Sequence, residues 1–270
     1  MAEPATQPNV ASSLGATLAD IGASFLSVAE TAGGMGLLFG KVLRRLAPPD
    51  IDGPELRRTL HKMAVRSLPI VVVTAIFTGA ITVIQAAPIV TRFQATGLLG
   101  WGAGFSIFRE IAPLLTALMI SGRVGANNTA ELGTMVVTEQ VDALRALAID
   151  PISFLVLPRF IGIVTTLFVM TIYADGVALV GAALAADGLL GVSPVSFMNG
   201  LTGGLLGVSD VLSGLVKSLV FGLMIAISSC YFGLATTGGA PGVGRSVNAT
   251  VVASAAGIFV LDYFVSFLLG

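Results

Sequence analysis

The sequence predicts an all-α integral membrane protein with about five transmembrane helices, preceded by N-terminal amphipathic helices at the membrane interface. The chain of 270 residues is 55% hydrophobic and only 11% charged, and its mean hydropathy is +0.94. This composition supplies too few charged side chains to cover a soluble domain of that length. Uncharged segments long enough to cross a bilayer also recur along the chain.

The region before the first uncharged segment divides into two parts. Residues 1–10 are polar and contain two prolines, and we expect them to be disordered. Residues 11–66 have apolar side chains near helical spacing, a glycine cluster at 33–36 and a basic stretch at 55–66. We interpret 11–66 as interfacial or elbow helices that lie along the membrane surface. A helix that crosses the membrane within this region is the alternative.

The segment 67–270 is expected to form the transmembrane domain. Its first span, 67–90, carries no charged residue and follows a group of basic side chains. The positive-inside rule therefore places the N-terminus in the cytoplasm. The basic residues are Arg44, Arg45, Arg57, Arg58, Lys62 and Arg66. Later spans are expected at about 104–121, at 154 to 175 or a little later, at 212–233 and at 249–269. Outer connections are expected at 91–102 and 186–210, an inner glycine-rich loop at 235–248, and an external C-terminus.

Charged residues at membrane depth are the first functional signal. Arg109 and Glu110 fall in the second expected span together with Pro113, and Lys217 falls in the fourth. Such charges cost several kcal/mol unless they pair or face a cavity. Adjacent residues on a helix point about 100° apart, so Arg109 and Glu110 need different partners. Lys217 is either a counterion for Glu110 or a side chain that snorkels to the interface.

The segment 122–151 gathers charge between two apolar spans. We expect it to lie in the cytoplasm and to contain a short amphipathic helix that Thr138 caps and that ends at Asp150–Pro151. In that helix Val141, Leu144 and Leu147 or Ala148 share one face, and charged residues take the other. Docking to a soluble partner and packing on the membrane surface fit this spacing equally well.

The charged motifs around this segment resemble the MlaE (YrbE) family of bacterial ABC-transporter permeases, which serve Mla and Mce lipid-transport systems. The resemblance covers about 55–270 and departs from the family pattern at Asn127, Asn128, Ala148 and 246–248. The matching residues are Arg109, Glu110 and Pro113; Gly122, Arg123 and Gly125; Ala130, Glu131, Gly133 and Met135; 138–144; Asp150 and Pro151; Pro158 and Arg159; Lys217 and Ser218; and the stretch 239–254.

The resemblance implies a permease of the bacterial inner membrane that works as a dimer, expected to be a homodimer, and moves phospholipid. Its implied partners are a cytoplasmic ABC ATPase that holds the ATP and Mg, an MCE-domain lipid-binding protein and a STAS-domain protein. The residues implied to couple to the ATPase are Glu131, Thr138, Glu139, Gln140, Asp142, Ala143, Leu144, Arg145 and Asp150. The residues implied to line a lipid cavity are Arg109, Glu110, Pro113 and Lys217.

Other classes of function find little support in the sequence. The stretch 33–43 imitates a phosphate-binding loop, but Met35 and Val42 stand where that motif needs Gly and Ser or Thr. We expect no cofactor, metal or enzymatic activity in this chain, because the sequence offers no cluster of metal ligands and no convincing Ser, His and Asp set. We expect no nucleic-acid partner, because no basic tract points to one. Two rivals remain: a secondary transporter or channel with an ion path through Arg109, Glu110, Lys217 and Asp262, and a scaffold that only anchors an ATPase.

Overall fold

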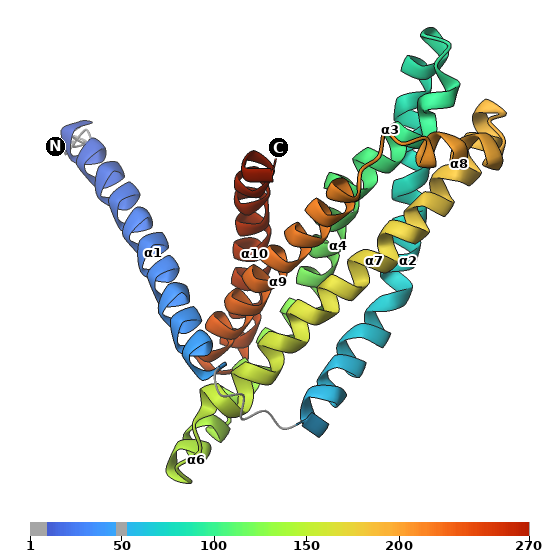
Figure 1. The fold of residues 1–270 in the computed structure, drawn as a ribbon. Helices are drawn as coiled ribbons and strands as arrows, with labels where there is room; N and C mark the ends of the chain where they lie inside the picture. Colours follow the sequence, from blue (N-terminus) through green and yellow to red (C-terminus); the bar gives the residue numbers. More distant parts are fainter. Residues whose placement is uncertain (1–9, 47–52, 270) are drawn as a thin grey trace.

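A computed structural model describes residues 10–46 and 53–269, and this part of the chain is a bundle of helices without strands (Figure 1). The α-helices are α1 (Val10–Arg45), α2 (Gly53–Arg92), α3 (Leu99–Ser106), α4 (Ala112–Ile120), α5 (Ala126–Val137), α6 (Gln140–Ala146), α7 (Leu157–Leu190), α8 (Pro194–Thr202), α9 (Val208–Leu234) and α10 (Gly239–Leu269). A short 3₁₀ turn, η1 (Thr96–Leu98), precedes α3, and three π-helical segments, η2 (Ile107–Ile111), η3 (Ser121–Gly125) and η4 (Ile152–Val156), join longer helices.

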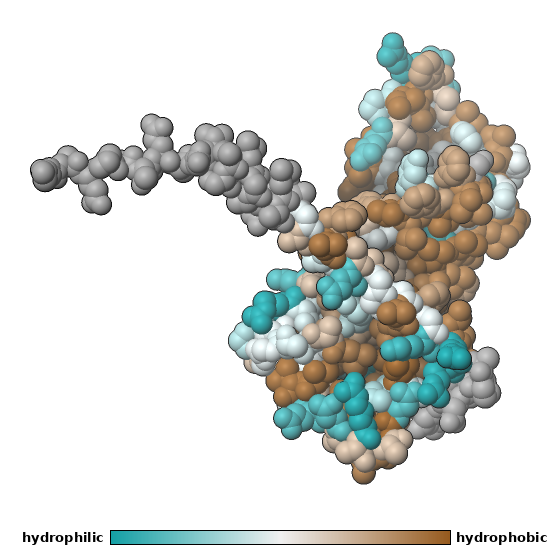
Figure 2. All heavy atoms as spheres, turned by 90° about the vertical axis from the view of Figure 1, so that its left-hand side faces the viewer, coloured by the Kyte–Doolittle hydropathy of each residue, from teal (hydrophilic) through white to brown (hydrophobic). Residues whose placement is uncertain are grey.

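Five helical stretches are long and apolar enough to cross a membrane, which confirms the predicted fold class. They are Arg57–Arg92, Thr96–Val137, Ile152–Leu190, Val208–Leu234 and Gly239–Leu269. Figure 2 shows a broad apolar surface over the middle and upper parts of the molecule, while hydrophilic side chains gather at the lower end. In Figure 1 that lower end carries α6 and the start of α2.

Helix α1 is continuous through the glycine cluster at 33–36. A Cβ atom on Gly34 would lie only 2.5 Å from the ring of Tyr231 on α9, so this glycine serves a close helix contact. Helix α1 diverges from the bundle and meets it near its C-terminal end (Figure 1). It is not among the five candidate spans, and its place at the membrane interface stays a prediction. The segment 1–9 lies outside the described residues.

The boundaries of several expected spans were wrong because helices continue through polar residues. The second stretch runs without a loop from Leu99 to Val137, so residues 122–137 of the expected loop 122–151 continue this helical run. Pro113 has no backbone N–H to donate to the carbonyl of Arg109, and η2 accommodates this interruption of the regular α-helical pattern. Helix α7 continues past Asp175 to Leu190, and α10 begins at Gly239 within the expected glycine-rich loop.

Helices α2 and α7 pack along most of their length through small side chains. Ala174, Ala178, Ala182 and Ala186 recur at four-residue intervals on α7 and are all buried. A Cβ on Gly181 would overlap the carbonyl oxygen of Ile76 on α2. Small residues allow this close backbone approach, which is how membrane helices gain packing energy without a hydrophobic driving force.

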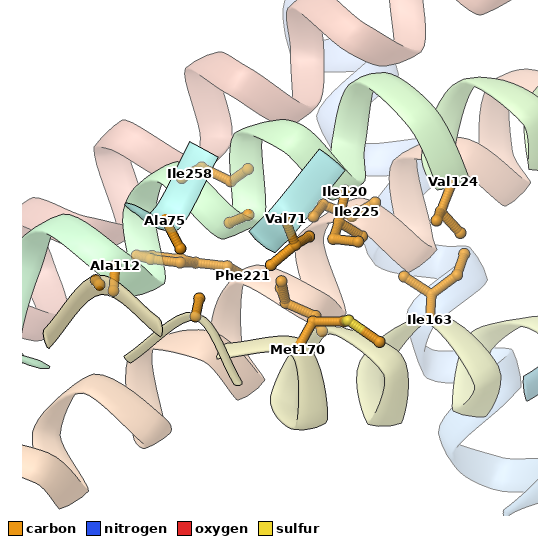
Figure 3. Packing of buried hydrophobic residues seen from close by; sticks show 14 of the residues in the cluster. Val71, Ala75, Ala112, Ile120, Val124, Ile163, Met170, Phe221, Ile225 and Ile258 are labelled. Carbon is orange, nitrogen blue, oxygen red and sulfur yellow. The ribbon is translucent and has the colours of Figure 1, made fainter. Parts of the chain in front are cut away.

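The centre of the bundle joins five helices. In Figure 3, apolar side chains from α2, α4, α7, α9 and α10 converge, among them Val71, Ile120, Met170, Phe221 and Ile258. All five are at most 3% exposed. This core fixes α4, α9 and α10 against one another. The charged groups described next lie on α9, on α10 and on η2, which directly precedes α4.

Candidate functional site

Lys217 on α9 is the centre of a buried charge cluster. Its side chain is 1% exposed, and its Nζ lies 2.5 Å from Oε2 of Glu110 and 2.9 Å from Oδ1 of Asp262 on α10. The counterion interpretation of Lys217 is therefore confirmed, and the snorkelling alternative was wrong. A cation so deep among the spans needs such partners because water does not reach it.

Gly214 lets α9 approach η2 closely enough to form this cluster. A Cβ at this position would overlap the carbonyl oxygen of Phe108 and lie 3.4 Å from Cγ of Pro113. Lys217 follows Gly214 by three residues, so both side-chain positions lie on the same face of α9. The π segment before Pro113 thus supplies both the carboxylate of Glu110 and the surface against which α9 packs.

Arg109 and Glu110 take different partners, as their helical spacing predicted. Nη1 of Arg109 lies 3.3 Å from Oδ1 of Asp210, and its guanidinium lies 5.4 Å from the ring centre of Phe105. Oε1 of Glu110 accepts a hydrogen bond of 3.2 Å from the hydroxyl of Ser266. The site therefore spans the second, fourth and fifth membrane stretches.

Two acidic residues of this site were missing from the predicted set. Asp262 entered the sequence interpretation only as part of an alternative ion path, and Asp210 was assigned to an outer connection. A carboxylate within an apolar span was a signal for Asp262, whereas its pairing with Lys217 depends on how the helices pack. Arg109, Glu110, Pro113 and Lys217 thus come together in the structure, and their contact with lipid stays a prediction.

The turn between α5 and α6 differs from the predicted cap at Thr138. The Thr138 hydroxyl donates to the carbonyl of Thr134 at 2.8 Å, and Glu139 adopts a left-handed conformation with φ 60°. Helix α6 begins at Gln140 without a side-chain cap. The Thr138 hydroxyl remains hydrogen-bonded to α5. The change of chain direction between α5 and α6 is therefore made by the left-handed backbone of Glu139.

The C-terminal end of α6 also differs from the prediction. The helix ends at Ala146, before Asp150–Pro151, and Ala148 takes a left-handed conformation with φ 59°. The backbone N–H of Ile149 donates to Leu144 and that of Ala148 to Arg145, at 2.9 and 3.0 Å, which is the Schellman pattern. Asp150 instead accepts from the backbone N–H of Ile152 at 3.2 Å and pairs with Arg45 at 3.1 Å.

Helix α6 presents a mixed polar and apolar surface. Val141 is 3% exposed and Leu144 is half-buried, whereas Leu147 is 71% exposed, so Leu147 does not share their buried face. Asp142 and Arg145 pair on the exposed side at 2.8 Å. The exposed residues of the predicted coupling set are Thr138, Glu139, Gln140, Asp142, Ala143 and Arg145.

Glu131 lies apart from the other predicted coupling residues. It is on α5 and forms ion pairs with Lys62 of α2 and, at 3.6 Å, with Arg159 of α7. Asn127 donates a hydrogen bond of 2.8 Å to the same carboxylate. Glu131 therefore ties α5 to α2 and α7, and a role in docking a partner stays a prediction.

The five apolar stretches and the buried charges define a multi-pass membrane protein with an ionisable site inside the bundle. The family described as Permease MlaE matches residues 56–268, and the chain belongs to this family.

Named relatives agree with the family and extend over most of the chain. A probable ABC transporter permease protein of Synechocystis sp. is 42% identical over 86% of this chain and 88% of its own length. A probable ABC transporter permease protein of Rickettsia typhi is 35% identical over 92% of this chain and 96% of its own. The chloroplastic protein Trigalactosyldiacylglycerol 1 of Arabidopsis thaliana is 34% identical over 85% of this chain and 65% of its own. The chain is thus similar over most of its length to proteins named as probable ABC transporter permeases.

Proposed function

We propose that this chain is the permease subunit of an ABC transporter that moves phospholipid, or a related lipid, between the inner membrane and the cell envelope. The observation that carries the proposal is the buried cluster of Lys217, Glu110 and Asp262 inside a mainly apolar bundle. A lipid needs apolar walls for its acyl chains and a few charges for its headgroup. The name of the Arabidopsis relative refers to a glycerolipid, which supports this class of substrate.

A separate ATPase would supply the energy, since relatives are named as ABC transporter permeases. Helix α6 is the proposed docking element because it lies at the lower end of the molecule (Figure 1), where hydrophilic side chains gather (Figure 2). Its charged side chains and the following Leu147 are exposed. ATP and Mg would bind to that partner. The permease itself would perform no covalent chemistry.

One helical stretch could carry motion from α6 to the charge cluster. Residues Leu99–Val137 form a continuous run through η2 and η3, and Glu110 lies about 40 Å from the α5 end of this run at 1.5 Å per residue. π-helical segments occur frequently at functional sites and mark places where a helix departs from regular geometry. A shift of α6 would therefore reach Glu110 through a rigid element with two built-in irregularities.

Family membership supports a proposal for the wider assembly. A second copy of this chain would form a homodimer, an MCE-domain lipid-binding protein would dock on the outer face, and a STAS-domain protein would join the ATPase. The basic residues before the first span favour a cytoplasmic N-terminus in the bacterial inner membrane. Family membership favours this assembly over a secondary transporter or a passive scaffold.

Co-purification tests the docking step. The chain is expressed with its ATPase, purified by a tag on the permease, and analysed for bound ATPase and phospholipid. Glu139→Lys with Asp142→Lys should abolish ATPase recovery but leave the lipid. The matched control is Glu30→Lys with Asp187→Lys, which makes the same charge change at exposed positions on α1 and α7 and should retain both. Normal ATPase recovery with the α6 variant would disprove the docking assignment.

A further inference from the structure

A second charged site lies between α2, η3, α5 and α7, apart from the Lys217 cluster. A pocket of about 300 Å³ is lined there by six charged residues, which are Arg58, Lys62, Arg66, Arg123, Glu131 and Arg159. Five cations thus face a single carboxylate. Arg58, Arg66 and Arg123 form no ion pair within the described part of the chain, so the pocket has a surplus of positive charge.

Buried polar groups at this pocket are also without a partner. The Nη1 atom of Arg159 and the hydroxyl of Ser67 have no hydrogen-bond partner among the described residues, and Ser67 is fully buried. Buried donors are nearly always satisfied in native proteins, and an exception calls for an explanation. Arginine donors match the geometry of phosphate oxygens, often through two parallel hydrogen bonds. An anionic phosphate group would satisfy both the donors and the unpaired charge.

The position of the pocket favours a phosphate that belongs to a lipid. Its α2 wall begins in the basic stretch with Arg58 and ends at Ser67, where the uncharged run of the first span starts. The pocket therefore lies at the level where a hydrocarbon core meets its headgroups. Met63 and Val124 give it apolar wall as well. Basic pockets between transmembrane helices on the cytoplasmic side of a membrane suit anionic headgroups. The basic residues before the first span favour this side for the start of α2.

We propose that this pocket binds the phosphate headgroup of an anionic membrane lipid from the leaflet at the α6 end of the molecule. The site differs from the Lys217 cluster in its helices and in its strongly positive charge. A bound headgroup would bridge α2 to η3 and α7 through Arg58, Arg123 and Arg159. It would thus stabilise the end of the bundle from which α6 projects.

The test measures lipid binding by the full chain in detergent, with native mass spectrometry as the readout. The probes are dioctanoyl phosphatidylglycerol, dioctanoyl phosphatidylcholine and inorganic phosphate. Arg58→Gln with Arg123→Gln should weaken phosphatidylglycerol binding about ten-fold or more, since a lost charge-assisted hydrogen bond typically costs that factor. The matched control is Lys41→Gln with Arg44→Gln, which removes two exposed cations from α1 and should change binding less than two-fold.

Each outcome decides the proposal. If Arg58→Gln with Arg123→Gln and the control Lys41→Gln with Arg44→Gln lose phosphatidylglycerol binding equally, the pocket is not the binding site. The same holds if neither variant loses binding. Inorganic phosphate that displaces phosphatidylglycerol at equal concentration would show a site for soluble anions and overturn the lipid assignment. Arg58→Lys with Arg123→Lys keeps both charges but loses the paired arginine donors. It should bind phosphatidylglycerol more tightly than the glutamine variant and less tightly than the wild type, which separates charge loss from misfolding. The readout needs neither ATPase nor transport, so its failure would leave the proposed function standing.

Discussion

Removing both carboxylate partners of Lys217 should destabilise the protein strongly. In Glu110→Gln with Asp262→Asn, the Lys217 side chain remains 1% exposed in the native geometry, but its ammonium group has no anion beside it. An uncompensated buried charge of this kind typically costs about 3–5 kcal/mol. Asp262 contributes more of this than Glu110, because the Asp262 side chain is 18% exposed and that of Glu110 is 42% exposed.

The magnitude translates into a thermal shift. For a chain of this size, each kcal/mol moves the midpoint of unfolding by about 2–4 °C, so the double variant should unfold about 10 °C below the wild type. The assay is thermal unfolding of the purified chain in detergent, followed by intrinsic fluorescence and by light scattering. Adding Lys217→Met removes the unpaired cation and fills similar volume, and the triple variant should return to within a few degrees of the wild type.

Two results would refute this reasoning. A double variant as stable as the wild type would show that Lys217 is not a buried cation that depends on these two carboxylates. A triple variant as unstable as the double would show that the loss comes from packing of the carboxylates rather than from an unpaired charge. A stable triple variant that fails to move lipid would separate the functional role of the cluster from its structural one.

Three further substitutions, two of them with a matched control, test particular contacts by the same unfolding assay. Gly214→Ala places a Cβ against the carbonyl of Phe108 and should lower the stability by about 1–3 kcal/mol. The control Gly176→Ala has open space around it and should stabilise α7 by up to about 1 kcal/mol. Equal effects of the two substitutions would contradict the close approach of α9 to η2. Gly181→Ala should likewise destabilise the α2–α7 contact by about 1–3 kcal/mol. The control Gly188→Ala on the same helix, with open space around it, should not destabilise it. Indistinguishable unfolding midpoints of these two variants would disprove that packing. Ala148→Gly should stabilise the end of α6 by about 0.5–1 kcal/mol, because glycine adopts φ 59° without the strain that alanine has there; a lower midpoint would argue against the left-handed turn.

Sequence patterns predicted the number of spans well because hydropathy over about 20 residues reflects a strong physical constraint. They failed at span ends where polar groups are satisfied by distant helices. The local sequence predicts Glu131 in a loop, whereas the structure places it on α5, where it pairs with Lys62 and Arg159. No local pattern contains that information.

The candidate site was predictable in part for a similar reason. Arg109, Glu110 and Lys217 were recognisable because charges are costly within apolar spans. The sequence left open whether Lys217 pairs with Glu110 or snorkels to the interface, and the structure decides for the pair. The role of Gly214 could not be predicted, since it depends on the carbonyl of Phe108 that a π segment presents. At Thr138 the local preference for capping was overridden by the left-handed turn at Glu139.

ATP-driven lipid transfer in proteoliposomes tests the central claim most directly. The permease and its ATPase are reconstituted together, ion gradients are collapsed with ionophores, and the movement of a fluorescent phospholipid is followed after ATP is added. The account predicts transfer that requires ATP, ignores the ion gradient, and is lost both in Glu139→Lys with Asp142→Lys and in the triple variant that lacks the Lys217 cluster. Transfer that persists without ATP and follows an imposed ion gradient would contradict it.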